Sequence, residues 1–430
     1  MDIATLYTYF MECGEVTTDS RHCPEGSLFI ALKGASFNGN AFAAQALQLG
    51  CRYAIIDEAE YADPANSRLL LVDDCLKTLQ QLANYHRRQL GTRMIGITGT
   101  NGKTTTKELI AAVLKEKYNV LYTQGNFNNH IGVPLTLLQL TKEHELAVIE
   151  MGANHPGEIH TLVHIAEPDY GIITNVGKAH LEGFGSFEGV IRTKGELYDY
   201  LRTKPESVVF LQNENPHLNG IVGDLRTVRY GKEKGLYVSG EVEACTPFLS
   251  YQWTAEENTY QVQTHLIGSY NLDNALAATA IGRYFGVSDE QICHALSTYV
   301  PRNNRSQLTE TADNRLIVDA YNANPTSMMA ALENFKLIEA PHKMVILGDM
   351  KELGAGSKDE HQKIVDFLHT CPFDRIVLVG GEFTSTASGF ECYPDTPSLT
   401  EVLKNEKPKD MLILVKGSNS MKLSALQDIL

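Results

Sequence analysis

Apolar residues along this chain form short continuous runs that alternate with stretches in which apolar positions recur every three or four residues. Continuous runs are typical of strands buried on both faces, and the three-to-four spacing is typical of amphipathic helices. Their alternation predicts parallel sheets covered by helices, which is an α/β fold. The predicted strands are 27–32, 53–56, 69–72, 94–97, 146–150, 170–174, 208–212, 316–319, 344–347, 375–379 and 411–415. The predicted helices include 41–49, 76–86, 103–115 and 269–285.

The pattern divides into three α/β units. We expect a small N-terminal domain at 1–88, a larger central domain with a parallel sheet at 89–299, and a C-terminal domain at 300–430. The stretch 237–267 is predicted to be a strand-rich flank of the central domain, and 300–305 is predicted to be a hinge. A chain of 430 residues exceeds the usual size of a single hydrophobic core, so several domains are expected.

Composition narrows the class of protein. Hydrophobic residues make up 43% and charged residues 21%, as in ordinary globular proteins. The net charge of −15 argues against a nucleic-acid binder, whose surface would be basic. The eight cysteines form no CxxC pair, so reduced thiols are expected. No apolar run approaches the roughly 20 residues of a membrane span, and no basic leader begins the chain, so we expect a cytoplasmic protein.

The segment MIGITGTNGKTTTK, residues 94–107, carries the strongest functional signal. Its apolar start predicts a strand, the glycines a tight loop, and Lys103 the first turn of a helix. Such a loop surrounds phosphate oxygens with backbone N–H groups, and the helix N-terminus favours negative charge. Lys103 would reach the β- and γ-phosphates and Thr104 would bind Mg²⁺. The nucleotide-binding residues predicted here are Gly99, Thr100, Asn101, Gly102, Lys103, Thr104 and Thr105.

The match to the standard phosphate loop is incomplete, because Ile97 stands where that pattern has its first glycine. An ordinary strand–helix turn is therefore the alternative at this position. Glu150 ends a predicted strand, where it is either a Mg²⁺ ligand or a solvated acid. His180 follows another strand and is either a ligand or a structural histidine. By composition alone, Lys194 is an ordinary surface lysine.

Polar turns follow three apolar strands of the C-terminal unit, at 319–325, 348–354 and 416–420. The carboxyl ends of parallel strands meet at one edge of a sheet, so these turns are predicted to form a binding rim. The N-terminal unit has two small polar loops, at 18–21 and 32–34. These loops either bind a diphosphate or are plain turns.

Taken together, the motifs GTNGKTTTK, NVGKAHLEGFGS, SYNLDNALAA and DAYNANPTSM, with the segment around Lys194, resemble the Mur ligases, which build the peptide stem of bacterial cell-wall precursors. The resemblance covers nearly the whole chain. It implies an N-terminal domain for a UDP-sugar, a central ATP-binding domain similar to P-loop ATPases, and a C-terminal Rossmann-like domain. It also implies ATP-dependent joining of D-Ala-D-Ala to UDP-MurNAc-tripeptide through an acyl phosphate.

The same resemblance implies roles for individual residues. Lys103, His180 and Lys194 would be catalytic, and two Mg²⁺ ions would be bound by Thr104, Glu150, His180 and a carbamylated Lys194. Further ATP contacts would come from Asn271, Asn274, Arg305 and Asp319. Substrate contacts would come from Ser20, Arg21, Lys33, Asn128, Asn129, Tyr321, Asn322, Asn324, Lys416 and Ser418.

Two other functions stay open from the sequence. One is a different amide ligase of the same fold, such as a folate–glutamate type, although the N-terminal loops argue against it. The other is a non-catalytic nucleotide-binding scaffold, which the joint presence of Glu150, His180 and Lys194 disfavours. The expected partners are small molecules, with no nucleic acid and no membrane span, and a monomer is expected.

Overall fold

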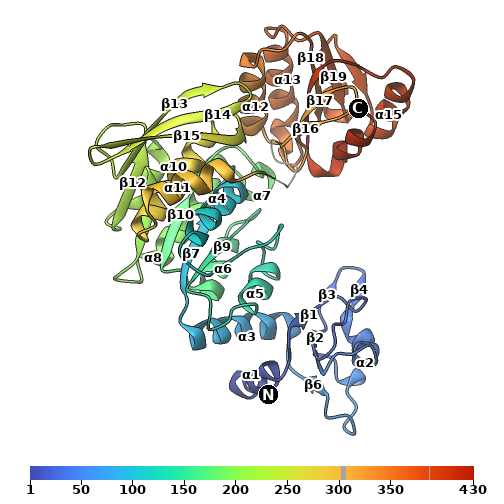
Figure 1. Ribbon diagram of the computed structural model, residues 1–430. Helices are drawn as coiled ribbons and strands as arrows, with labels where there is room; N and C mark the ends of the chain where they lie inside the picture. Colours follow the sequence, from blue (N-terminus) through green and yellow to red (C-terminus); the bar gives the residue numbers. More distant parts are fainter. Residues whose placement is uncertain (302–306, 387) are drawn as a thin grey trace.

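The computed structural model describes residues 1–301, 307–386 and 388–430. These residues form three main sheets, of four, nine and six strands, and one two-stranded ribbon. Figure 1 shows the N-terminal sheet at the lower right, the central sheet at the left and the C-terminal sheet at the upper right. The α/β class predicted from the apolar pattern is confirmed.

The N-terminal sheet is parallel, with strand order β1-β2-β5-β6. Its strands are β1 (Val16–Thr17), β2 (Leu28–Ile30), β5 (Tyr53–Ile56) and β6 (Leu69–Leu71), and the separate ribbon pairs β3 (Lys33–Gly34) with β4 (Phe37–Asn38). The helices are α1 (Ile3–Met11), α2 (Ala43–Gln48) and α3 (Cys75–Leu90). Helix α3 begins where the Asp74 side chain accepts from Lys77 N at 2.8 Å, and it ends at Gly91, which has a left-handed φ of 66°.

Helix α3 joins the N-terminal unit to the central one. Its buried apolar side chains, including Leu79 and Leu82, belong to one continuous hydrophobic core that also contains Val133 and Leu162 of the central unit. Polar contacts support the same interface, because Arg87 Nε donates to Ala166 O at 2.8 Å. In Figure 1 this helix lies along the lower edge of the central unit.

The central sheet has the order β15-β14-β13-β12-β11-β10-β7-β9-β8. Strands β7 to β13 pair in parallel, whereas β13, β14 and β15 form an antiparallel flank, as the stretch 237–267 predicts. The strands are β7 (Arg93–Thr98), β8 (Val120–Tyr122), β9 (Leu146–Glu150), β10 (Tyr170–Ile173), β11 (Val208–Gln212), β12 (Thr227–Gly231), β13 (Val238–Cys245), β14 (Phe248–Ala255) and β15 (Asn258–Ile267). The helices are α4 (Lys103–Lys115), α5 (Gly132–Leu137), α6 (Glu158–Ala166), α7 (Leu181–Phe184), α8 (Phe187–Leu201), α9 (Pro216–Val222), α10 (Asn271–Tyr284) and α11 (Asp289–Thr298).

The C-terminal sheet has the order β16-β17-β21-β18-β19-β20, and only its edge strand β16 is antiparallel among the pairs described. Its strands are β16 (Gln307–Glu310), β17 (Arg315–Asp319), β18 (Lys343–Gly348), β19 (Arg375–Val379), β20 (Glu391–Tyr393) and β21 (Leu412–Lys416). Its helices are α12 (Pro325–Leu337), α13 (Ser357–Leu368), α14 (Gly381–Thr384) and α15 (Thr396–Asn405). Separate apolar clusters cover its two faces, one of which reaches Ile267 of the central flank. Residues 302–305 of the predicted hinge fall outside the described residues.

Candidate active site

The phosphate-loop segment forms the strand, turn and helix that its pattern predicts. Strand β7 ends at Thr98 and helix α4 begins at Lys103. Gly99 and Gly102 both have positive φ, of 144° and 77°. A Cβ at Gly99 would lie 2.1 Å from Thr174 Oγ1, and one at Gly102 would lie 2.6 Å from Asn274 Oδ1. At both positions glycine is therefore required for two reasons, the backbone conformation and the lack of space for a Cβ.

Side chains directly after the neighbouring strand β10 support this loop. Asn175 accepts from Asn101 N at 2.9 Å and donates to Asn101 O at 3.0 Å, and Thr174 Oγ1 donates to the same carbonyl at 2.6 Å. Lys103 Nζ donates to the carbonyls of Gly99 at 2.8 Å and Thr100 at 3.1 Å. The lysine ammonium thus lies against its own loop, next to the place where a phosphate would enter.

A buried polar cluster lies beside the start of α4. Thr104 Oγ1 donates to the Glu150 carboxylate, with distances of 3.1 and 3.0 Å to its two oxygens. Asn128 Nδ2 donates to Glu150 Oε1 at 2.9 Å, and Lys107 Nζ lies 3.7 Å from Oε2. A hydroxyl and a carboxylate placed together are hard oxygen ligands of the kind that Mg²⁺ takes along with phosphate oxygens. The donor set therefore fits Mg²⁺.

Lys194 is buried, with 2% of its surface exposed, so the interpretation of a surface lysine is wrong. The physical reason is that α8 turns this residue toward α6 and Phe184, and sequence composition does not reveal which face of α8 is covered. Lys194 Nζ donates to Ala153 O at 3.3 Å and lies 5.2 Å from the centre of the Phe184 ring. Burial, reinforced by the nearby charge of Lys103, lowers the pKa of Lys194 to about 7.

His180 lies close to the same aromatic ring, with 6.2 Å between the ring centres of His180 and Phe184. Phe184 therefore has His180 and Lys194 as common neighbours. His180 has a left-handed φ of 50°, which is uncommon for a residue with a side chain. Its Nδ1 forms a hydrogen bond with the Glu352 carboxylate of the C-terminal unit. Burial lowers the pKa of this imidazole.

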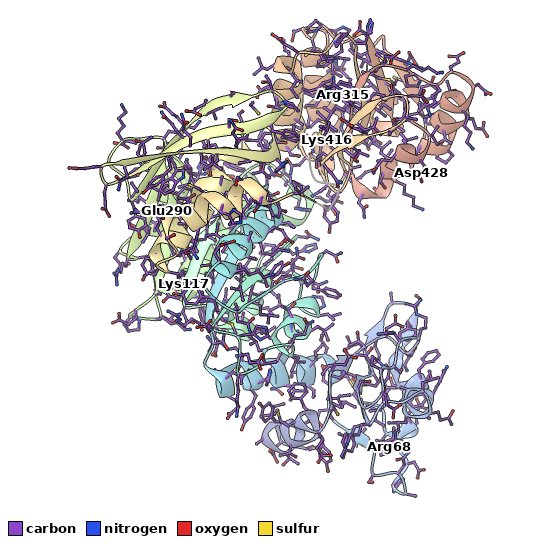
Figure 2. The ribbon with its side chains drawn as sticks, in the orientation of Figure 1. Arg68, Lys117, Glu290, Arg315, Lys416 and Asp428 are labelled. Carbon is purple, nitrogen blue, oxygen red and sulfur yellow. The ribbon has the colours of Figure 1, made fainter. Side chains whose placement is uncertain are left out.

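The C-terminal turns meet the central loop at one edge. Asn324 Nδ2 donates to Asn101 Oδ1 at 2.7 Å, so the phosphate loop and the turn before α12 are in direct contact. Lys416 Nζ is buried and pairs with Asp319 at the ends of the adjacent parallel strands β21 and β17. Lys416 also donates to Asn322 O at 3.4 Å. Figure 2 labels Lys416 on the part of the C-terminal unit nearest the central one.

A cavity of about 900 Å³ lies between these two units. Many of the predicted residues line it, namely Thr100, Asn101, Gly102, Lys103, Thr104, Thr105, Asn128, Asn129, Glu150, His180, Asn271, Asn274, Asp319, Tyr321, Asn322 and Lys416. Gly99, Lys194, Asn324 and Ser418 do not line it. The first three form hydrogen bonds with residues of its wall, namely Lys103, Ala153 and Asn101, and Ser418 accepts from Lys351 N in the turn 348–354. Arg305 falls outside the described residues.

The three N-terminal candidates lie away from this cavity. Arg21 pairs with Asp19 and is largely exposed, and Ser20 is buried in the same turn. Lys33 Nζ lies 3.0 Å from Asp57 and 3.2 Å from Glu58. The cavity therefore does not include them, and their predicted role needs a separate binding surface.

Several residues of the site were not predicted. Asn175 and Lys107 lie within two of the quoted motifs, as the first residue of NVGKAHLEGFGS and the last of GTNGKTTTK. A search for polar residues directly after each strand, and for lysines in the first turns of α4, would have found them. Glu352 lies in the polar turn 348–354, but nothing in the sequence links it to His180.

In the described ranges no three His, Cys, Asp or Glu residues cluster as a ready-made metal site. None of the helices described has the length and apolar character to cross a membrane.

Comparison with known proteins agrees with this geometry. Three family models match in order: the Mur ligase family catalytic domain at 13–87, the Mur ligase middle domain at 97–282, and the Mur ligase glutamate ligase domain at 304–419. The chain is 38% identical to a UDP-N-acetylmuramoyl-tripeptide–D-alanyl-D-alanine ligase of Bacillus subtilis, over 96% of this chain and 92% of that protein.

Solved structures give the same result over almost the full length. A MurF crystal structure from Acinetobacter baumannii has a TM-score of 0.88 at 32% identity, covering 99% of this chain and 97% of that one. MurF from Thermotoga maritima, solved in complex with ADP, has a TM-score of 0.86 at 27% identity, covering 98% and 97%. The three domain matches, the identity and the coverage agree: the chain belongs to the Mur ligase family.

Proposed function

We propose that this chain is an ATP-dependent ligase that joins D-alanyl-D-alanine to UDP-N-acetylmuramoyl-tripeptide and releases ADP and phosphate. The observation that carries the proposal is the cavity, which has a phosphate loop on one wall and the polar turns of a second unit on the other. The B. subtilis relative with that activity in its name is similar over nearly the entire chain. Nucleotide binding is supported by the loop geometry and by the related T. maritima protein with ADP.

The reaction needs activation, because a carboxylate is a poor acylating agent. Transfer of the γ-phosphoryl group of ATP to the tripeptide carboxylate gives an acyl phosphate, which the amine of the dipeptide attacks with loss of phosphate. In this proposal Lys103 and the N-terminus of α4 bind the phosphates. Asn271 and Asn274 line the adenine side, and Asp319 with Arg305 contacts the rest of the nucleotide. The turn with Tyr321, Asn322 and Asn324, together with Lys416 and Ser418, faces the dipeptide.

Two Mg²⁺ ions are part of the proposal, one at Thr104 and Glu150 and one at His180 and Lys194. Bound Mg²⁺ would neutralise the converging phosphate and carboxylate charges. Lys194 fits carbamylation because only the neutral amine takes up CO₂, and burial favours that neutral form.

Lys194→Ala should lose most turnover and recover part of it with small carboxylates, whereas Lys194→Arg should have equally low turnover because guanidinium stays protonated and forms no carbamate. Full activity in Lys194→Arg would contradict the carbamate hypothesis.

The remaining assignments are also proposals. We infer domain bounds of 1–88, 89–299 and 300–430, which keep each main sheet within one domain. Ser20, Arg21 and Lys33 are proposed to bind the UDP group on the N-terminal domain, and Asn128 and Asn129 to face the muramoyl peptide at the cavity. A cytoplasmic location and a monomeric state complete the proposal.

A phosphate-release assay tests the function. The purified protein receives ATP, Mg²⁺ and UDP-muramoyl peptides of different lengths, each with D-Ala-D-Ala or a single amino acid. We expect phosphate release only with the tripeptide and the dipeptide together. Equal turnover with a single amino acid would assign an earlier stem-peptide ligase, and no release with any pair would indicate a nucleotide-binding scaffold.

A further inference from the structure

Glu352 brings a carboxylate from the C-terminal unit to the imidazole of His180 in the central unit. Their contact is a hydrogen bond between His180 Nδ1 and Glu352 Oε2. The backbone reinforces it, because Glu182 N donates to Glu352 O at 3.5 Å. Glu352 is thus engaged through both its side chain and its main chain.

Both residues have unusual backbone conformations. His180 and Glu352 have left-handed φ angles of 50° and 64°, and neither is glycine. Such conformations cost about 1–2 kcal/mol each, and they cluster at functional sites. Here they occur on the two residues that meet across the unit boundary, which is a specific arrangement rather than a chance surface contact.

The turn that carries Glu352 is fixed from several sides. The buried Asp349 carboxylate accepts from the backbone N of Glu382 at 3.1 Å and of Phe383 at 3.0 Å. Met350 N donates to His361 Nε2 at 3.0 Å, and Lys351 N donates to Ser418 Oγ at 3.0 Å. The three residues directly before Glu352 are therefore each held by hydrogen bonds, and the Glu352 carboxylate lies on a well-supported turn.

The chemistry of metal-bound histidine explains such a partner. A histidine that binds a cation through one ring nitrogen usually donates the other N–H to a carboxylate, which fixes the tautomer and the ring orientation. With Nδ1–H donated to Glu352, the lone pair of His180 is on Nε2, and His180 lines the cavity. Glu352 is 54% exposed in its side chain, so its contact contributes little to stability.

We propose that Glu352 is a positioning residue, which fixes the Nδ1–H tautomer of His180 and leaves Nε2 to bind a cation in the cavity. Because Glu352 belongs to the C-terminal unit, this orientation exists only when that unit lies against the central one. The contact would therefore couple the position of the C-terminal unit to the assembly of the cation site. The claim that His180 binds a cation rests on the proposed function, whereas the claim about its tautomer rests on the hydrogen bond alone.

The tautomer is measured in the protein without nucleotide or metal, by long-range proton–nitrogen NMR on the ¹⁵N-histidine-labelled chain. The chain has 14 histidines, and the signals of His180 are those lost in His180→Asn. We expect the wild type to carry the proton on Nδ1, Glu352→Ala to show a mixture of tautomers, and Glu352→Gln to restore Nδ1–H through its amide oxygen. Glu360→Ala is the matched control, since it removes the neighbouring contact of Lys178 with Glu360 at 3.4 Å.

Mn²⁺ binding in the presence of a non-hydrolysable ATP analogue is the second readout. We expect Glu352→Ala to weaken one class of Mn²⁺ site by about 10- to 100-fold, with Glu360→Ala unchanged. A wild-type tautomer in Glu352→Ala, or equal effects of Glu352→Ala and Glu360→Ala, would overturn the proposal. Failure of the phosphate-release assay together with the expected tautomer shift would reject the ligase function and keep the positioning role.

Discussion

Lys103 connects the phosphate loop to the chemistry expected of it. Its ammonium lies against the carbonyls of Gly99 and Thr100, and its side chain is only partly buried. Removing it therefore opens no core cavity, but it removes the positive charge nearest the loop. Lys103→Ala should lower ATP turnover by at least about 100-fold while the melting temperature changes little. Lys115→Ala, at the exposed end of the same helix, is the control and should keep turnover; a folded Lys103→Ala enzyme with normal turnover would contradict the loop assignment.

Lys194 should lower the stability of the protein in the absence of CO₂. Its pKa is lowered to about 7 from the ordinary 10.5, so the unfolded chain binds more protons than the folded chain between these values. Stability of the wild type should therefore rise with pH across this window. Lys194→Met should be more stable by about 1–3 kcal/mol near pH 7, and this advantage should shrink toward pH 10.

Chemical denaturation in CO₂-free buffer at several pH values measures this difference. Lys115→Met, which changes an exposed lysine, should show no pH-dependent difference from the wild type. If Lys194→Met is destabilised at every pH, the buried amine has a stabilising partner and the pKa argument fails.

The phosphate loop illustrates an element whose conformation follows from its own sequence. Gly102 and Gly91 both have positive φ, of 77° and 66°. A Cβ at Gly102 would meet Asn274 Oδ1 at 2.6 Å, whereas a Cβ at Gly91 would meet nothing within 4 Å. Gly91→Ala should therefore cost only the backbone term, about 1–2 kcal/mol of stability.

Gly102→Ala should cost that term and also displace Asn274, which accepts from Thr106 Oγ1 at 2.9 Å and donates to Asn271. We expect nucleotide affinity to fall in Gly102→Ala and to stay unchanged in Gly91→Ala. Calorimetric titration with ADP, alongside denaturation of both variants, measures the two effects. Equal nucleotide affinity in the two variants would show that the contact with Asn274 is unimportant for binding.

The elements that could be predicted from the sequence are those specified locally. The limits of β9, β11 and β19 agree with the predicted ranges, because each strand is a continuous apolar run with one polar residue at one end, namely Glu150, Gln212 or Arg375. Helix α3 is longer than predicted, since it runs from Cys75 to Leu90 and its last turn is basic rather than apolar.

Parts of the site depend on tertiary contacts and could not be predicted in this way. Glu352 reaches His180, and Asn324 reaches Asn101, only because two sheets lie side by side; nothing in either local pattern encodes its partner. The burial of Lys194 depends in the same way on which face of α8 is covered.

The whole molecule has two kinds of boundary between its units. The boundary between the N-terminal and central units is apolar, because α3 contributes to a core that runs through both. The boundary between the central and C-terminal units has polar contacts, of Asn101 with Asn324 and of Lys178 with Glu360, and a smaller apolar part where Ile267 joins a core of the C-terminal unit. Polar interfaces of this kind permit relative motion of domains, and closure on substrates would use the second boundary.

This difference predicts the order of unfolding. Leu82 on α3 and Leu332 on α12 are both fully buried, the first in the shared core and the second in a core of the C-terminal unit. Each change to alanine should cost about 2–5 kcal/mol, but in a different cooperative unit. In differential scanning calorimetry, Leu82→Ala should lower the transition that contains the N-terminal and central units, and Leu332→Ala should lower a separate C-terminal transition. If both variants shift one and the same transition equally, the polar boundary couples the units as tightly as the apolar one does.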